Sequence, residues 1–273
     1  MEAFTVSTKV LNSTAAGDLL KLWRERRGKS QLDLAIDASV SQRHISFIEN
    51  GRSIPSRQML LSLAGVLDLP LRDRNALLLA GGFAPIYSER TWDSPGMGSL
   101  TAAVQRMLRQ QEPYPAIVLD RYWNVVMTNE ASPRFFGKFV DLGRRPEPRN
   151  MLHLIFDPDG MRPFVVDWER TAATLIARVH RETAGRVTEA RTRALIDGLL
   201  AYPDVESHWR DVSQQDDLPM IPLSFMRDGT VLSYFSMVTT VGAPMDVLTQ
   251  ELRIESLFPA NAETELYHEK HFA

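Results

Sequence analysis

The side chains best suited to specific recognition lie in the stretch SQRHISFIENGR. A helix over this stretch that buries Ile45 and Ile48 leaves Gln42, Arg43 and Phe47 on its outer side. An exposed amide and an exposed guanidinium donate several hydrogen bonds, and the guanidinium adds a fixed positive charge. This side of the helix is therefore suited to a polar partner, and the surrounding helices decide which partner can reach it.

Five helical runs between residues 17 and 81 have to position this surface. The first ends at Gly28, in the left-handed conformation common at helix ends. The second begins at Ser30, in capping-box spacing with Asp33, and the third begins with Ser41 as its N-cap. Two helices of about eight residues are unstable alone. Packed crosswise they form a helix-turn-helix, whose second helix is free to enter the major groove of DNA. The alternative is an ordinary helical hairpin.

Residues 17–81 resemble the Cro/C1-type, or XRE, class of helix-turn-helix regulators. The matching positions are Ser30-Gln31, Leu34-Ala35, Val40-Ser41, Ile45, Ile48-Glu49, Asn50-Gly51-Arg52 and Pro55. The resemblance implies that Gln42 and Arg43 reach base edges, with Arg43 able to bind guanine O6 and N7. The residues for which it implies contacts with DNA phosphates are Gln31, Ser41, His44 and Arg52.

Phe47 and Glu49 need separate explanations within this class. A polar base reader is common at the position of Phe47, so the ring either contacts a thymine methyl group or forms a buried flank of the helix. Glu49 would repel nearby phosphates, and the resemblance implies that it pairs with Arg24. We expect a partly exposed pair that contributes about 0.2–1 kcal/mol to stability.

The rest of the chain predicts an α+β domain of PAS-like topology after the all-α five-helix head. Residues 82–99 are rich in Gly and Pro without a sustained period, as in a linker. Two strands within residues 115–129 precede several helices, the last at Val205–Val212, and three strands follow within residues 221–258. Asp228-Gly229 is a strong hairpin signal. This order predicts an antiparallel five-stranded sheet with helices over one face.

The expected boundaries divide the chain into five parts. They are an N-terminal tail at 1–16, the helix-turn-helix domain at 17–82, a linker with a connecting helix at 83–104, the PAS-like domain at 105–262, and a C-terminal tail at 263–273.

Three segments of the second domain resemble the ligand-binding domain of MmyB-like transcription regulators. They are DPDGMRPFVVDWERTA, SHWRDVSQQD and LTQELRIESLFPANAETE. The resemblance covers about residues 105–262 and implies a cavity for a small, largely apolar molecule, with fatty acids the best-known candidates. Several aromatic and Met side chains are candidates for the lining of this cavity, and they suit a packed core equally. They are Phe164, Trp168, Phe225, Tyr234, Phe235 and Met237. The candidate cations for a carboxylate are Arg170 and Arg178.

A basic stretch runs from Arg178 to Arg193 and includes Arg181, Arg186 and Arg191. It is suited to a solvated helix face, to a dimer contact, or to the mouth of the ligand cavity, and the sequence leaves these alternatives open.

Other kinds of site find little support. The absence of Cys excludes disulfides and thiolate metal sites. His268 and His271 form a bare pair in a polar tail, so we expect no zinc site. Asp157–Gly160 resembles the start of a calcium loop, but Trp168 stands where a Glu ligand is needed, so we expect a turn. Because no Ser-His-Asp arrangement is visible, we expect no enzymatic activity and no cofactor other than a bound fatty acid or similar molecule.

Charge and targeting signals agree with a cytoplasmic DNA-binding protein. The net charge is −3, with +3 in residues 17–90 and −6 in residues 91–273. A mildly basic head on an acidic body fits a DNA-binding module joined to another domain, although random scatter gives the same numbers. We find no targeting segment at the N-terminus and no apolar run of about 20 residues.

These observations favour a transcription regulator that binds double-stranded DNA and senses a small-molecule effector. We expect a homodimer on a palindromic operator, because one head contacts too few base pairs for useful specificity. The main rival is a regulator whose body binds a protein partner and has a close-packed core. A third hypothesis is an enzyme fused to a DNA-targeting head.

Overall fold

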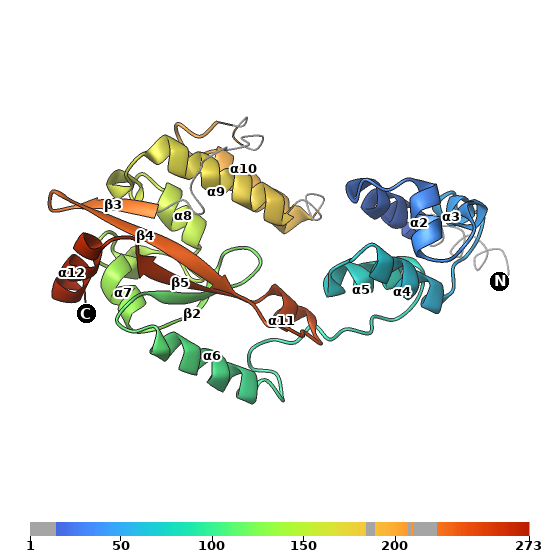
Figure 1. Cartoon of the computed structure of the whole chain (residues 1–273), viewed down its shortest axis with the longest axis horizontal. Helices are drawn as coiled ribbons and strands as arrows, with labels where there is room; N and C mark the ends of the chain where they lie inside the picture. The colour runs from blue at the N-terminus through green and yellow to red at the C-terminus, as the bar shows by residue number, and fades with distance from the viewer. Residues whose placement is uncertain (1–14, 184–188, 207–208, 210–222, 273) are drawn as a thin grey trace. The chain divides into compact units, whose positions relative to one another are not determined.

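The structure is a computed structural model of the 273-residue chain, and it describes residues 15–183, 189–206, 209 and 223–272. The chain divides into two compact units (Figure 1). The head holds the residues up to Thr91 together with residues 242–250, and the body holds residues 92–241 and the residues after 250.

The N-terminal part of the head forms the five-helix bundle that the sequence predicts, and Figure 1 labels four of its helices. The helices are residues 15–26, α2 (Gln31–Asp37), α3 (Gln42–Glu49), α4 (Arg57–Val66) and α5 (Leu71–Ala80). Leu20, Leu34, Ile45, Ile48 and Leu60 are fully buried at its centre. Burying one such side chain contributes about 1.5–3 kcal/mol, so the short helices α2 and α3 are stable because they pack within the bundle.

The ends of α2 and α3 are capped as their sequences predict. Ser30 Oγ accepts a hydrogen bond from the Asp33 N–H at 3.1 Å, and the Asp33 carboxylate accepts one from the Ser30 N–H at 2.8 Å. Ser41 Oγ accepts a hydrogen bond from the His44 N–H at 3.2 Å. Gly28 has a φ of +64°, so it supplies the left-handed conformation that ends the first helix.

The head also includes a segment from far along the sequence, residues 242–250, which holds most of α11 (Val247–Glu251). The first residue of α11 is fully buried, and its N–H donates to the Ser88 carbonyl oxygen at 2.9 Å. The Leu71 N–H donates to Gln250 Oε1 at 2.6 Å. The sequence patterns did not predict this association, because it depends on contacts between segments far apart in the chain.

The body is built on the antiparallel five-stranded sheet that the sequence predicts, with strand order β2-β1-β5-β4-β3. The strands are β1 (Ala116–Leu119), β2 (Val125–Thr128), β3 (Leu223–Arg227), β4 (Thr230–Thr239) and β5 (Arg253–Pro259). The β3–β4 turn contains Asp228 and Gly229, with φ of +49° and +80°. Two consecutive positive φ values are what a type I′ hairpin turn requires.

Helices cover both faces of this sheet, whereas the order of elements predicted helices over one face (Figure 1). Side chains alternate between the faces along a strand. In β1, Ile117 and Leu119 belong to the main core, while Ala116 and Val118 belong to a second cluster that includes α6 (Gly98–Gln110). The sequence predicts α6 as a helix, but its amphipathic pattern does not show which face it covers.

Most other helices of the body pack on the main core, and they include one that the sequence did not predict. They are α7 (Ala131–Phe136), α8 (Met151–Phe156), α9 (Trp168–Thr183), α10 (Ala190–Leu200) and α12 (Ala262–His271). The residues of α12 were expected to be a polar tail. His268 is fully buried there, with Nδ1 at 2.8 Å from Tyr234 Oη and Nε2 at 3.0 Å from the Pro113 carbonyl oxygen. The helix escaped notice because polar residues make up much of its buried side.

One further expectation can be compared with the described residues, and another lies largely outside them. Asp157–Gly160 leads into a turn, as expected. Most of the run Val205–Val212, and residues 221–222 of the third expected strand, lie outside the described residues. Within the described residues, no group of three or more His, Cys, Asp or Glu could hold a metal ion, and no helix is long and apolar enough to cross a membrane.

Candidate DNA-binding surface and ligand cavity

The outer side of α3 presents the side chains that the sequence assigns to DNA. Ser41, Gln42 and Arg43 are exposed, and His44 is half-buried. The Arg43 guanidinium lies over the Phe47 ring, with its central carbon 5.0 Å from the ring centroid. Phe47 is itself half-buried, so its ring is both a flank of the helix and a support that orients Arg43. Such a cation–π contact contributes about 0.5–1 kcal/mol at an exposed site.

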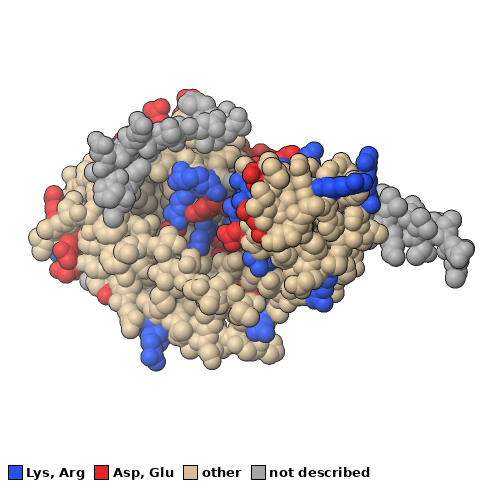
Figure 2. All heavy atoms as spheres, turned by 45° about the vertical axis from the view of Figure 1, so that its right-hand side comes forward, with Lys and Arg blue, Asp and Glu red and all other residues tan. Residues whose placement is uncertain are grey.

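The other residues expected to contact phosphates lie just outside α3 or on α2. Arg52 is exposed. Gln31, the first residue of α2, donates through Nε2 to Glu49 Oε2 at 2.8 Å, so this bond already orients its amide. On the described part of the face drawn in Figure 2, basic side chains lie singly or beside acidic ones and form no broad patch.

The expected ion pair between Arg24 and Glu49 is present, and it is buried. Arg24 Nε lies 2.7 Å from Glu49 Oε1, and Nη2 lies 3.0 Å from Oε2. The two side chains are 9% and 2% exposed. The hydrogen bonds to Glu49 raise the pKa of Arg24, although burial opposes this. The expectation of a partly exposed pair was wrong. Because the pair is buried, removing either partner leaves a buried charge without its counter-charge.

Gly17 lets the first helix of the head cross the end of α3 at close range. A Cβ atom at this position would lie 2.4 Å from the Ile48 carbonyl oxygen. The obstacle is backbone, so no side-chain rotation would relieve the clash. Close backbone packing and the Arg24–Glu49 pair therefore both fix the orientation of α3.

The body contains a cavity of about 340 Å³ between the inner face of the sheet and the helices that cover it. Small-molecule sites typically have volumes of about 300–1,000 Å³, so the cavity is large enough for a small guest. Its apolar lining includes Ile117, Phe136, Met151, Ile155, Leu175 and Leu257. Its charged lining residues are Arg178, Arg181 and Glu255.

One side of α9 runs along this cavity. Thr171, Thr174, Arg178 and Arg181 all line it, and spacings of three or four residues place them in one row on the helix. At 1.5 Å per residue the row is about 15 Å long. The cations lie at its C-terminal end, so the cavity is charged toward one end of the row.

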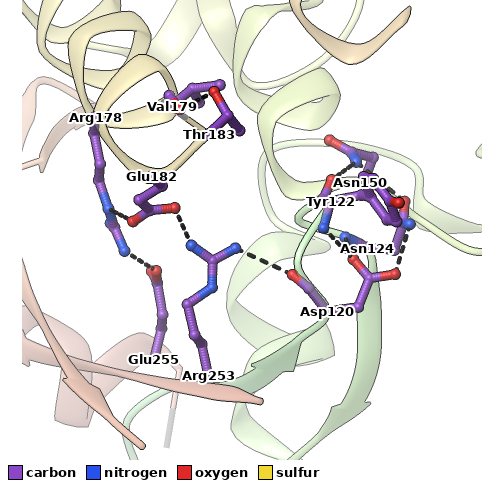
Figure 3. A network of polar contacts seen from close by, with 10 residues as sticks. All are labelled: Asp120, Tyr122, Asn124, Asn150, Arg178, Val179, Glu182, Thr183, Arg253 and Glu255. Carbon is purple, nitrogen blue, oxygen red and sulfur yellow. Dashed lines mark hydrogen bonds and ion pairs between the residues drawn. The ribbon is translucent and has the colours of Figure 1, made fainter. Parts of the chain in front are cut away.

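Arg178 is held by two carboxylates at the wall of the cavity (Figure 3). Its Nε lies 2.8 Å from Glu182 Oε1, and its Nη2 lies 2.5 Å from Glu255 Oε1. Glu182 also pairs with Arg253, whose Nη2 donates to the Asp120 carbonyl oxygen at 3.1 Å. Burial lowers the pKa of Arg178, but the two carboxylates outweigh burial and the pKa is raised. Arg178 is therefore a compensated charge.

Trp123 lies close to two guanidinium groups of this network and also lines the cavity. Its ring centroid is 4.4 Å from the central guanidinium carbon of Arg178 and 4.8 Å from that of Arg253. The residue is buried and has a φ of +66°, which is rare for a bulky side chain. Backbone strain of this kind persists only where the surroundings fix it, and it is common at ligand sites.

Arg181 makes no ion pair with any described residue and remains exposed. It lies one helical turn from Arg178 and lines the same end of the cavity. Prediction from sequence placed it only in a basic stretch with several interpretations, and named Arg170 and Arg178 as the cations. The spacing of Arg181 from Thr171, Thr174 and Arg178 is the signal that would have identified it.

The other residues expected at the ligand site are distributed unevenly. Arg178 and Phe235 belong to the lining. Phe225 and Tyr234 are fully buried in the main core, and Phe164 and Trp168 pack against that core. Met237 is 57% exposed. Arg170 is exposed and lies outside the lining. The sequence identifies apolar strand residues, but it does not show which of them face the core, the cavity or solvent.

Comparison with known families matches both units. Residues 15–77, which include α2 and α3, match the model of a helix-turn-helix domain. Residues 100–269, which include the whole cavity lining, match the MmyB-like transcription regulator ligand binding domain, and this match covers more than half of the chain. A comparison with curated proteins found no significant match. The chain belongs to the family of MmyB-like transcription regulators and has an N-terminal helix-turn-helix DNA-binding domain.

Proposed function

We propose that this protein is a cytoplasmic, sequence-specific regulator that binds a palindromic operator as a homodimer and responds to a small, largely apolar ligand. Two heads related by two-fold symmetry supply the base contacts that one head lacks. Gln42 and Arg43 read base edges from the exposed side of α3. The residues that we assign to phosphates are Gln31, Ser41, His44 and Arg52. We assign no catalytic step to the chain, since both family matches are to regulatory domains.

The observation that carries the sensor proposal is the apolar cavity with a charged end. The charges of Arg178 and Arg253 are balanced by those of Glu182 and Glu255. Arg181 then leaves one positive charge without a described partner. A guest with one negative charge on an apolar chain, such as a fatty acid, would place its carboxylate beside Arg181 and its chain among the apolar residues.

The cavity also weighs against the rival hypothesis of a body that binds only a protein partner. Such a body needs no internal ligand space, and protein interiors are otherwise packed about as densely as organic crystals. Native mass spectrometry of the purified protein separates the two hypotheses, because a co-purifying ligand adds its mass to that of the polypeptide.

A ligand changes DNA binding only if it favours one arrangement of the dimer over another. The chain passes between head and body three times, and the third passage ends at Glu251. Glu251 pairs with Arg121 at 2.9 Å, and Arg253 pairs with Glu182 beside the cavity. We assign the coupling to this charged network and, through the chain itself, to residues 242–250 of the head.

The test measures operator affinity of the full chain, with and without ligand. An operator is selected from random DNA with the purified protein, and bound lipid is removed by extraction with organic solvent. Saturating dodecanoate should then change operator affinity by about 5–150-fold, the usual range of such coupling. Dodecanol, which has the same chain without the charge, should change it less. Unchanged operator affinity with bound dodecanoate would refute the proposed coupling.

A further inference from the structure

A second hollow in the body shares no lining residue with the cavity. It is an open groove of about 590 Å³ formed by α8, α10, the residues between β1 and β2, and the segment before α8. Its lining combines the ring side chains Tyr122, His153 and Tyr202 with two prolines and three arginines. Flat rings and guanidinium groups therefore occur together in one depression that the proposed sensor function does not use.

The arginines of the groove differ in how far their hydrogen-bonding capacity is already used. Arg145 is paired with Asp157, which also lines the groove, so Arg145 is compensated locally. Arg149 donates through Nε to the Leu142 carbonyl oxygen at 3.1 Å and pairs through Nη1 with Glu147 at 2.6 Å. The Glu147 side chain is 63% exposed. Exposed pairs are weak, so a ligand carboxylate can replace Glu147 at small cost.

Arg191 makes no ion pair with any described residue. Its central guanidinium carbon lies 4.2 Å from the centroid of the Tyr122 ring. The Tyr122 hydroxyl donates to Glu189, and burial together with this bond raises the pKa of Tyr122 to about 12. The hydrogen bond to Glu189 orients the Tyr122 side chain. Arg191 lies against the Tyr122 ring, and none of the described residues accepts a hydrogen bond from its guanidinium group, whose N–H donors can therefore bind a ligand.

His153 adds a ring with one nitrogen that no described residue binds. Its Nδ1 lies 3.1 Å from Tyr202 Oη, and Nε2 has no hydrogen-bond partner among the described residues. Burial lowers the pKa of His153 despite the nearby Asp157 carboxylate, so the ring is neutral at neutral pH. A Cβ atom at Gly198 would lie 3.2 Å from His153 Cε1. Glycine at this position of α10 therefore leaves room for the imidazole.

We propose that this groove is a second small-molecule site and that it binds a planar aromatic carboxylate. A guanidinium binds a carboxylate through two parallel hydrogen bonds, which Arg191 can supply, and Arg149 adds a second guanidinium to the same groove. The rings of His153 and Tyr202 offer surfaces on which an aromatic ring stacks, whereas the Tyr122 ring already lies against the guanidinium groups of Arg121 and Arg191. A phosphate would leave these rings unused, and an alkyl carboxylate would gain less from them. The site is independent of the cavity, so the body binds two different effectors.

The test titrates benzoate into the full-length protein by isothermal titration calorimetry. Benzoate should bind the wild-type protein saturably, and R191Q should weaken this binding about tenfold through the loss of charge-assisted hydrogen bonds. R193Q is the matched control, because Arg193 is an exposed residue of the same helix outside the groove lining. This variant should bind benzoate like the wild type. Benzyl alcohol, which keeps the ring without the charge, should bind the wild-type protein much more weakly than benzoate.

Four results would overturn this proposal. The first is that millimolar benzoate shows no saturable binding to the wild-type protein, and the second is that R191Q and R193Q bind benzoate with equal affinity. The third is that inorganic phosphate competes as well as benzoate itself, and the fourth is that dodecanoate displaces benzoate. The last result would place benzoate in the cavity. None of them bears on dodecanoate binding to the cavity, which is measured separately in the absence of benzoate.

Discussion

Replacing Arg24 by Met should remove most of the stability of the head. Met fills much of the space of the Arg stem. Among the described residues, however, Gln31 is then the one remaining hydrogen-bond donor to the Glu49 carboxylate, at 2.8 Å, and the Glu49 side chain is only 2% exposed. Removing one partner of a buried ion pair costs about 3–5 kcal/mol. A single core of fewer than about 70–80 residues rarely supplies more than about 3–5 kcal/mol. The loss is therefore comparable with the whole stability of the head.

A double variant separates the buried charge from the packing. Arg24→Met with Glu49→Leu removes both charges, and replacing a whole buried pair by apolar residues is often neutral or stabilising by about 1–4 kcal/mol. We expect the double variant to be more stable than Arg24→Met alone. The pair between Lys29 and Asp37 in the same head is the control, because its side chains are 32% and 41% exposed. Lys29→Met should cost only about 0.2–1 kcal/mol.

Hydrogen exchange of the amides in residues 42–49 is the assay, because a chain of two units does not unfold in one two-state step. Exchange of these amides reports the free energy of opening around α3 separately from the unfolding of the body. Two outcomes would refute the reasoning. One is a change of less than about 1 kcal/mol in Arg24→Met, the size expected of an exposed pair, and the other is a double variant no more stable than this single variant.

Three further predictions concern DNA, ligand and pH. Arg43→Ala should weaken operator binding by about 1–3 kcal/mol and relax preference at one base position, and a gel-shift titration at fixed salt that shows unchanged affinity would exclude the assigned role. Arg181→Gln should weaken dodecanoate binding by about 1 kcal/mol, since the exposed cation is screened by water, whereas Arg170→Gln outside the lining should not, and competition titrations with a fluorescent fatty acid compare the two. The body should lose stability as pH falls below about 6.5, the ordinary pKa of His. Burial lowers the pKa of His268 in the folded body, so in this range the unfolded chain binds a proton that the folded body does not. The loss from this residue is at most about 1.4 kcal/mol per pH unit, and urea midpoints at pH 7.5 and 5.5 should differ less in His268→Asn than in the wild type.

The five N-terminal helices of the head could be predicted from sequence, because their signals lie within a few residues of the structures they form, whereas the association of residues 242–250 with the head could not. Gly28, the Ser30–Asp33 capping box and Ser41 mark helix ends directly, and the apolar spacing of α3 shows which side is buried. The burial of the Arg24–Glu49 pair could not be predicted in this way. It depends on how closely the first helix crosses α3, and that distance follows from three-dimensional packing.

The body shows where sequence patterns stop being informative. The hairpin at Asp228 could be predicted because the signal for a tight turn lies within a few residues, and the order of elements predicted the sheet. The face of the sheet that α6 covers could not be predicted, because an amphipathic helix can pack on either face. Helix α12 could not be predicted from an apolar pattern, because its buried side includes His268, which makes two hydrogen bonds, where an apolar residue would be expected. The cavity lining could not be predicted either, because the sequence does not show which face of the sheet each strand residue occupies. Met237 on β4, for example, was expected in the lining and is exposed to solvent.

The two arginines one turn apart on α9 have separate roles in the proposed sensor. An unpaired cation at the wall of an apolar cavity is costly, and the carboxylates of Glu182 and Glu255 offset that cost for Arg178. Arg181 needs no such partner because it is exposed to water. A guest carboxylate then meets Arg181 where little desolvation is required, while its chain lies among the apolar residues of the cavity. In the proposed sensor, the described carboxylates compensate Arg178 whether or not a guest is bound, and Arg181 is the cation for the guest, so folding of the body does not depend on the guest.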